Sequence, residues 1–178
     1  MILAIFDTET TGLTLPTCAD LSAQPHIIEL GAIKIDFTGN KLGELSQLIK
    51  PPVEIIPKIT KITGIKNEDV AEAPSFLEFL PKLKSFFEGV EVLVCHNVVF
   101  DSLMLRIELE RCGCFDFPTP PQSICTVQEY QHLFGRRPSL KMLYEKIIGK
   151  SLQQTHRALD DAKALSSILK KDGFYSIF

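Results

Sequence analysis

The chain opens with "MILAIFDTETTG" (residues 1–12), in which an apolar run leads directly into two carboxylates. Residues 1–6 are almost wholly apolar, which predicts a buried strand. Asp7 and Glu9 follow one residue apart, and side chains i and i+2 of a strand point to the same face. Two carboxylates aimed at one point repel each other unless a positive charge offsets them. The stretch therefore predicts a cation site at the end of a buried strand.

Length and composition indicate one soluble domain spanning residues 1–178. A chain of 178 residues with 45% apolar and 23% charged side chains can bury a substantial core. Its apolar runs are far shorter than a membrane helix requires, and its start lacks the basic leader of a signal peptide. We therefore expect a cytoplasmic protein without a membrane association. The net charge of −3 argues against a protein that coats DNA non-specifically, but local basic pairs such as Arg136 and Arg137 leave nucleic-acid binding open.

The cysteine pattern predicts reduced thiols. The count is odd, and no secretion signal accompanies it, so a disulfide framework is not expected. The "CGC" at 112–114 lacks the two-residue spacing of a zinc knuckle. We expect core or surface thiols at Cys18, Cys95, Cys112, Cys114 and Cys125.

The order of the predicted elements indicates an α/β fold. Strands are predicted over 1–6, 26–36, 41–51 and 90–97, and a short strand runs into a helix over 123–134. Residues 14–25 form a loop, and short helical turns fit the stretch between 56 and 70. Helices are predicted over 73–89, 98–113, 139–149 and 156–171; Pro74 suits the start of the first, and Pro81 should kink or split it. Hairpin strands followed by alternating strands and helices predict a mixed sheet covered by helices.

A third acid, Asp101, lies on the predicted inner face of the 98–113 helix. It follows "CHN" at the end of the most apolar strand, 90–97. It shares a helical row with Met104, Leu105, Leu109 and Cys112. An acid in the first turn also complements the helix dipole, so this position alone does not decide its role.

A fourth acid comes from the last helix, where two aspartates are adjacent. A helix separates neighbouring residues by roughly 100°. Asp161 falls in an apolar row with Ala158, Leu165 and Ile168, which predicts that it points inward. Asp160 falls in a mostly polar row, which predicts a solvated carboxylate paired with Arg157.

His156 precedes this helix. If both residues were helical, His156 and Asp161 could not share a face, because five residues correspond to roughly 140° of rotation. Thr155 and His156 are therefore predicted to lie in the loop that enters the helix. Imidazole titrates near neutral pH, so a loop histidine over the site is suited to take a proton from water.

Four carboxylates and one histidine together predict a centre for phosphodiester hydrolysis. Oxygen ligands favour hard cations such as Mg²⁺ or Mn²⁺. Two such ions about 3.5–4 Å apart activate a water and stabilise the leaving oxygen in phosphodiester displacement. The predicted metal ligands are Asp7, Glu9, Asp101 and Asp161.

Three segments also resemble a known family. "DTETTG" (7–12), "HNVVFD" (96–101) and "HRALDD" (156–161) are similar to the three motifs of the DEDDh 3′–5′ exonucleases. This DnaQ-like family includes the proofreading epsilon subunit of bacterial DNA polymerase III, the exonuclease domain of the PolC-type polymerase, ribonuclease T and oligoribonuclease. The resemblance spans nearly the whole chain, in the order and with the spacing of the family.

The resemblance implies a ribonuclease H-like fold with a central five-stranded mixed sheet flanked by helices. It implies two Mg²⁺ or Mn²⁺ ions on the four carboxylates and His156 as general base. It further implies that the 3′-terminal nucleotide lies along Thr10, Thr11 and Gly12, with Asn97 and Phe100 lining the strand path. The expected partner is the 3′ end of single-stranded DNA or RNA, and a DNA polymerase is a second candidate.

Several alternatives remain open from the sequence. A ribonuclease T-like or oligoribonuclease-like enzyme would act on RNA, and no residue declares a contact to the 2′-OH. "DTETT" approaches the D-x-D-x-T motif of haloacid dehalogenase-like phosphatases, although a glutamate replaces the second aspartate and His156 has no role there. A nucleic-acid-binding module without activity is the non-enzyme alternative, although all five catalytic positions are filled.

Overall fold

A five-stranded mixed sheet forms the centre of the computed structural model, which describes residues 1–16, 20–153 and 155–174. The strands are β1 (Ile2–Thr10), β2 (Ile27–Asp36), β3 (Lys41–Leu48), β4 (Val92–Cys95) and β5 (Gln122–Cys125). Their order is β3-β2-β1-β4-β5. β1 pairs antiparallel with β2 and parallel with β4, so the strand that carries the acidic pair is central. The predicted five-stranded mixed sheet is confirmed.

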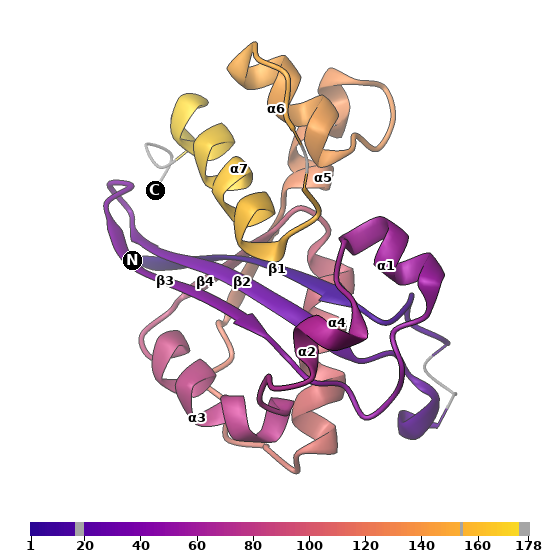
Figure 1. Ribbon diagram of the computed structural model, residues 1–178. Helices are drawn as coiled ribbons and strands as arrows, with labels where there is room; N and C mark the ends of the chain where they lie inside the picture. Colours follow the sequence, from indigo (N-terminus) through magenta and orange to yellow (C-terminus); the bar gives the residue numbers. More distant parts are fainter. Residues whose placement is uncertain (17–19, 154, 175–178) are drawn as a thin grey trace.

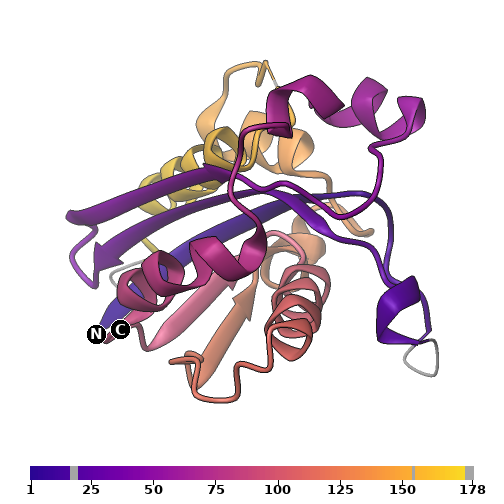
Figure 2. The same cartoon turned by 60° about the horizontal axis from the view of Figure 1, so that its bottom comes forward.

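Helices cover both faces of this sheet. They are α1 (Pro57–Thr63), α2 (Asn67–Val70), α3 (Phe76–Phe87), α4 (Val98–Arg111), α5 (Thr126–Tyr130), α6 (Leu140–Ile148) and α7 (Ala158–Lys171), with 3-10 turns at Leu21–Ala23 and Gln131–Leu133. Figure 1 shows α6 and α7 on one side of the sheet and α3 and α4 on the other, and the turned view of Figure 2 shows the same division.

Alternation along β1 assigns its side chains to two separate cores. Ala4 and Phe6 pack in the core beneath α3 and α4, whereas Leu3 and Ile5 pack in the core beneath α6 and α7. The same alternation continues into the polar end of the strand. It places Asp7 and Glu9 on the α7 side of the sheet. Thr8 and Thr10 lie on the α4 side.

The first strand is longer than the apolar run that predicted it. Its pairing with β2 continues to Thr10, which lies opposite Ile27 after a register shift that follows Glu9. The acidic pair therefore lies inside the strand, because backbone pairing with β2 does not depend on apolar side chains. The pairing of β1 with β2 thus makes the side chains of Asp7 and Glu9 point to the same face of the sheet.

The helix predicted over 73–89 is one continuous element, Phe76–Phe87, so of the predicted kink or split at Pro81 the split does not occur. Its cap is Ser75 rather than Pro74: the Ser75 hydroxyl accepts from the Glu78 N–H, and the Glu78 carboxylate accepts from the Ser75 N–H at 2.7 Å. Pro81 lies on the exposed side. The inward row, which includes Phe79 and Leu83, packs into the core and holds the helix together through the proline.

Two further expectations can be compared with the described residues. No helix in that part of the chain is long and apolar enough to cross a membrane. Four cysteines carry free thiols there: Cys95 and Cys125 are buried, and Cys112 and Cys114 are partly exposed. The prediction for Cys18 lies outside the described residues.

Candidate active site

Two half-buried carboxylates at the end of β1 begin the site. Asp7 and Glu9 lie on the α7 face, in line with the buried Leu3 and Ile5. In the antiparallel register Asp7 lies opposite Gly31 of β2, and Glu9 lies opposite Glu29. The neighbouring strand therefore determines what comes close to each carboxylate.

Gly31 lets helix α7 approach the acidic pair. A Cβ at this position would lie 2.2 Å from the Leu159 backbone nitrogen and 2.3 Å from the Ala158 carbonyl carbon. The first turn of α7 thus rests on the backbone of β2, beside Asp7. This close approach brings Asp161, in the same turn, to the end of β1.

The burial of the two adjacent aspartates confirms the prediction that Asp161 points inward and Asp160 is solvated. Asp161 is 7% exposed, whereas Asp160 is exposed. The Asp160 carboxylate accepts a hydrogen bond from the Thr155 hydroxyl at 2.9 Å. The helical periodicity therefore selected the inward carboxylate.

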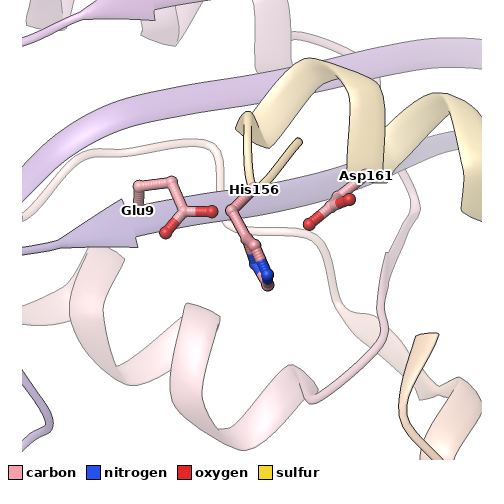
Figure 3. A group of neighbouring side chains, drawn as sticks. All are labelled: Glu9, His156 and Asp161. Atoms are coloured by element: carbon pink, nitrogen blue, oxygen red, sulfur yellow. The ribbon is translucent and has the colours of Figure 1, made fainter. Parts of the chain in front are cut away.

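Glu9, His156 and Asp161 form a compact cluster. One ligand atom from each residue lies within 4.8 Å of the other two. Figure 3 shows the His156 side chain between the two carboxylates, with Glu9 coming from β1 and Asp161 from α7. His156 lies before α7, as predicted, and its φ of 50° is the one positive value among the described non-glycine residues.

Asp101 reaches the same region from the first turn of α4, on the other side of the sheet. It is 4% exposed, and its Oδ1 accepts from the Thr8 N–H at 3.1 Å and from the Thr8 hydroxyl at 2.8 Å. Thr8 lies between the two acids of β1 and faces α4. One strand thus supplies two carboxylates on one face and the anchor of a third on the other.

A cavity of about 340 Å³ connects these groups. Asp7, Asp101 and Asp161 line it together, and Asp161 is thus shared with the cluster of Glu9 and His156. Arg137 also lines it and is the one Lys or Arg among the lining residues. All four predicted carboxylates and the predicted histidine are therefore brought to one region by β1, α4 and α7.

Burial raises the pKa values of three of these carboxylates, and repulsion between carboxylates adds to the shift for Asp7 and Glu9. Burial is the main cause for Glu9, followed by the charges of Asp161 and Glu29, and its pKa rises from 4.5 to about 8. Burial also raises the pKa of Asp7, with added repulsion from Asp101 and Asp161. The pKa of Asp101 is raised by burial too, and the hydrogen bonds from Thr8 partly counteract this.

This chemistry fits a divalent cation. Oxygen-rich clusters of this type favour Mg²⁺ or Mn²⁺. A cation would favour the ionised form of each carboxylate and so reverse the pKa shifts that burial and repulsion cause. The Glu9, His156 and Asp161 cluster meets the distance requirement for shared ligands.

The predicted pairing of Arg157 with Asp160 was wrong. Arg157 instead binds Glu29 of β2, with Nη2 at 2.6 Å and Nε at 3.0 Å from Oε1. Glu29 is 1% exposed and also accepts from the Ala158 N–H at 3.0 Å. The buried carboxylate of β2 is a stronger partner than a solvated one in the same helical turn, because the desolvated ion pair is poorly screened.

Residues 10–12 make local bonds that shape the strand exit. The Thr10 hydroxyl donates to the Gly12 carbonyl at 2.7 Å. The Thr11 N–H donates to the His26 carbonyl at 2.8 Å, and the Thr11 hydroxyl accepts from the His26 N–H at 2.9 Å. The Thr11 N–H is therefore occupied by a hydrogen bond within the protein.

Asn97 and Phe100 line the cavity, as the predicted strand path requires. The Asn97 side-chain oxygen accepts from Arg137 at 3.1 Å, and Phe100 also packs against the core beneath α4. His96 is fixed by both ring nitrogens, to the Thr126 hydroxyl and the Pro138 carbonyl, each at 3.1 Å. The contact with Pro138 anchors the loop that carries Arg137, and burial lowers the pKa of His96.

Three residues of the site were missed from the sequence: Thr8, Glu29 and Gly31. Glu29 carried a usable signal, since it is a lone acid within the apolar stretch "IIELGAI" (27–33), where a buried carboxylate requires a partner. Gly31 in the same strand indicated a close backbone approach. Thr8 carried no signal, because its partner lies 93 residues away.

Comparisons with known proteins identify relatives of this chain among exonucleases and DNA polymerase III proteins. A family model, RNase_T, described as an exonuclease, matches residues 4–169. A PolC-type DNA polymerase III of Clostridium perfringens is 36% identical over 93% of this chain but only 11% of that protein. The DNA polymerase III subunit epsilon of Treponema pallidum is 33% identical over 89% of this chain and 70% of that protein.

A solved structure shares the fold at low identity. The nuclease domain of 3′hExo, a DEDDh family member bound to rAMP, matches with a TM-score of 0.74 and 20% identity over 97% of this chain and 92% of that one. The fold and the convergent acids thus define a ribonuclease H-like nuclease.

The chain belongs to this exonuclease family and is related to the DNA polymerase III epsilon subunit. Family membership sets aside the phosphatase alternative and the binding-module alternative in favour of a nuclease enzyme.

Proposed function

We propose that this protein is a 3′–5′ exonuclease that removes nucleoside 5′-monophosphates from single-stranded DNA. The single observation that carries the proposal is the convergence of Glu9, His156 and Asp161 within 4.8 Å, beside a cavity lined by Asp7 and Asp101. No structural role requires four carboxylates in one place, because their mutual repulsion is unfavourable.

The proposed mechanism divides the work between ions and side chains. The four carboxylates would hold two Mg²⁺ or Mn²⁺ ions, which supply positive charge to activate water and to stabilise the leaving oxygen of the phosphodiester. Thr8 keeps Asp101 in position through the bonds to its Oδ1. His156 takes the proton from the attacking water at a ring nitrogen, as a general base.

The cavity supports a nucleic-acid substrate. Arg137 supplies a guanidinium to an otherwise acidic lining, and Asn97 orients it at 3.1 Å. Arginine binds phosphate oxygens through directed, charge-assisted hydrogen bonds. We assign Arg137 to a backbone phosphate of the substrate, and residues Thr10, Gly12 and Phe100 to its terminal nucleotides.

DNA is the preferred substrate in this proposal because relatives over 30% identical are named as DNA polymerase III proteins. RNA is the second candidate, since the structural neighbour at 20% identity is bound to rAMP. Because these relatives are named as DNA polymerase III proteins, we propose a DNA polymerase as partner. We further propose a role in proofreading and repair, in the cytoplasm. We treat residues 1–178 as a single exonuclease domain.

Product analysis tests the proposal. Single-stranded DNA and RNA of equal sequence, labelled at either end, are incubated with the purified protein in Mg²⁺, Mn²⁺ or EDTA. We expect 5′-labelled DNA to shorten one nucleotide at a time and 3′-labelled DNA to release labelled mononucleotide at once, only with metal. Internal cuts, loss from the 5′ end or activity in EDTA would overturn it, and faster RNA cleavage would favour the second candidate. An Asp7→Asn variant purified in parallel controls for contaminating nucleases.

A further inference from the structure

The conformation of His156 requires an external support. Its φ of 50° lies in the left-handed region, which residues with a Cβ seldom occupy unless surrounding contacts hold them there. His156 lies outside α7, so helical hydrogen bonding does not fix it. The support comes from its two neighbours in the chain, Thr155 and Arg157.

The residues that follow His156 are held by one buried carboxylate. Glu29 accepts three bonds from the Arg157 guanidinium, at 2.6, 3.0 and 3.1 Å, and one from the Ala158 N–H at 3.0 Å. Arg157 is the N-cap residue of α7 and makes no side-chain cap of its own. The Glu29 carboxylate therefore replaces the missing cap and fixes the chain immediately after His156.

The residue before His156 is also tied down. The Thr155 hydroxyl donates to Asp160, in the first turn of α7, at 2.9 Å. His156 thus lies between two anchored neighbours, one bound to the helix and one bound to β2. Glu29 lies opposite Glu9 in the strand register, so the anchor and a member of the candidate metal cluster are on adjacent strands.

Glu29 is not itself a ligand in this arrangement. It does not belong to the cluster of Glu9, His156 and Asp161, and its two oxygens already accept four bonds. Arg157 is 46% exposed at its side chain, so the pair extends from the interior to the rim of the site. The contacts of Glu29 and Arg157 therefore explain a role in orienting the chain beside His156.

We propose that Glu29 and Arg157 are positioning residues that hold the His156 imidazole close to the carboxylates of Glu9 and Asp161. The inference rests on the proposed function of His156 as general base. Loss of the bonds between Arg157 and Glu29 would free the backbone at His156 to relax to negative φ, and the imidazole would move away from Glu9 and Asp161. Misplacement of a catalytic group by about 1 Å costs up to roughly 100-fold in rate.

A double-mutant cycle tests the inference. Single-turnover release of the 3′-terminal nucleotide is measured with Mg²⁺ for Arg157→Lys, Arg157→Ala and Glu29→Gln, each alone and combined with His156→Ala. We expect each single variant to lower the rate roughly 10- to 100-fold, with the dissociation constant for the oligonucleotide unchanged within about twofold. Combined with His156→Ala, the same substitutions should cost less than about twofold, because they act through the histidine.

The controls separate positioning from folding. Arg157→Lys keeps the charge and loses the paired geometry, so it is the least disruptive variant. Arg106→Ala removes the exposed ion pair of Arg106 with Glu110 on α4 and should leave the rate unchanged. Melting temperatures of all variants show whether any loss of rate follows a loss of fold.

The outcomes are distinguishable. An undiminished loss in the His156→Ala background would overturn the inference, because Arg157 would then act on the metal ligands or on the fold. A normal rate for Arg157→Lys and Glu29→Gln beside a slowed His156→Ala would overturn it while leaving the proposed base intact. A normal rate for His156→Ala alone would overturn the proposed base, and the inference with it.

Discussion

Asp160 and Asp161 share a chemical identity but lie in different environments. Asp161 is buried at the end of β1 beside Glu9 and His156, and Asp160 is exposed and bonded to Thr155. A carboxylate that holds a cation cannot be replaced by an amide without loss of charge, whereas an amide oxygen still accepts the Thr155 bond. The two positions therefore form a matched pair.

We expect Asp161→Asn to reduce metal-dependent turnover by at least about 100-fold, and Asp160→Asn to change it by less than about threefold. Steady-state release of mononucleotide from labelled single-stranded DNA measures both. Comparable losses at the two positions would show that the buried carboxylate has no special role.

Arg136 and Arg137 form a second matched pair. Both side chains are exposed, but Arg137 lines the cavity and donates to Asn97, whereas Arg136 donates to the Met142 sulfur at 3.6 Å and does not line the cavity. We expect Arg137→Ala to raise KM for single-stranded DNA roughly tenfold through loss of a phosphate contact, and Arg136→Ala to raise it less than about twofold. Equal effects of the two substitutions, measured at one salt concentration, would indicate a diffuse charge effect.

At the scale of elements, the packing of α7 on β2 determines the positions of His156 and Asp161. Glycine is required at position 31 because a Cβ would meet the α7 backbone at 2.2 Å. Gly43 of β3 is a suitable comparison, since a Cβ there would lie at ordinary contact distances of 3.5 Å from the Phe86 ring and 3.9 Å from the Lys34 Cβ. Both residues lie within strands of the same sheet.

Gly31→Ala should destabilise the protein by at least about 1–3 kcal/mol, because α7 must shift away from β2, and should abolish turnover even at temperatures where the variant remains folded. Gly43→Ala should change stability by less than about 1 kcal/mol in either direction. Urea denaturation and nuclease assays on the same preparations measure both. Retained activity in folded Gly31→Ala would mean that the position of α7 is not critical.

At the scale of the whole molecule, the site costs stability when metal is absent. Burial raises the pKa of Glu9 from 4.5 to about 8, so the folded protein keeps a proton that the unfolded chain has already released above pH 4.5. Stability therefore falls as pH rises through this window and levels off above about pH 8. Raised pKa values at Asp7 and Asp101 act in the same direction.

We expect the melting temperature in EDTA to fall by about 5–10 °C between pH 6.5 and 8.5. Mg²⁺ at pH 8.5 should restore it, because an ion that binds only the folded state stabilises that state. Asp7→Asn should raise the melting temperature in EDTA at pH 8.5 and weaken the response to Mg²⁺. A melting temperature in EDTA that rises over this interval would contradict the proposed concentration of charge. The lowered pKa of His96 acts in the opposite direction mainly below pH 6.5, which is why the interval begins there.

The sequence by itself determined much of this protein. Alternation and helical periodicity are local properties, so they predicted the mixed sheet, the strand-borne acids Asp7 and Glu9, and the inward direction of Asp101 and Asp161. The chain position of His156 before the last helix also followed from periodicity. These predictions needed only the repeat distances of strands and helices.

Only the tertiary structure decided how the elements meet. The partner of Arg157 is Glu29, 128 residues away, and the anchor of Asp101 is Thr8, 93 residues away. The continuity of α3 through Pro81 likewise depended on its packing against the sheet. Contacts between distant segments arise when backbones approach closely, as α7 does at Gly31, and no local repeat in the chain encodes which side chains then become neighbours.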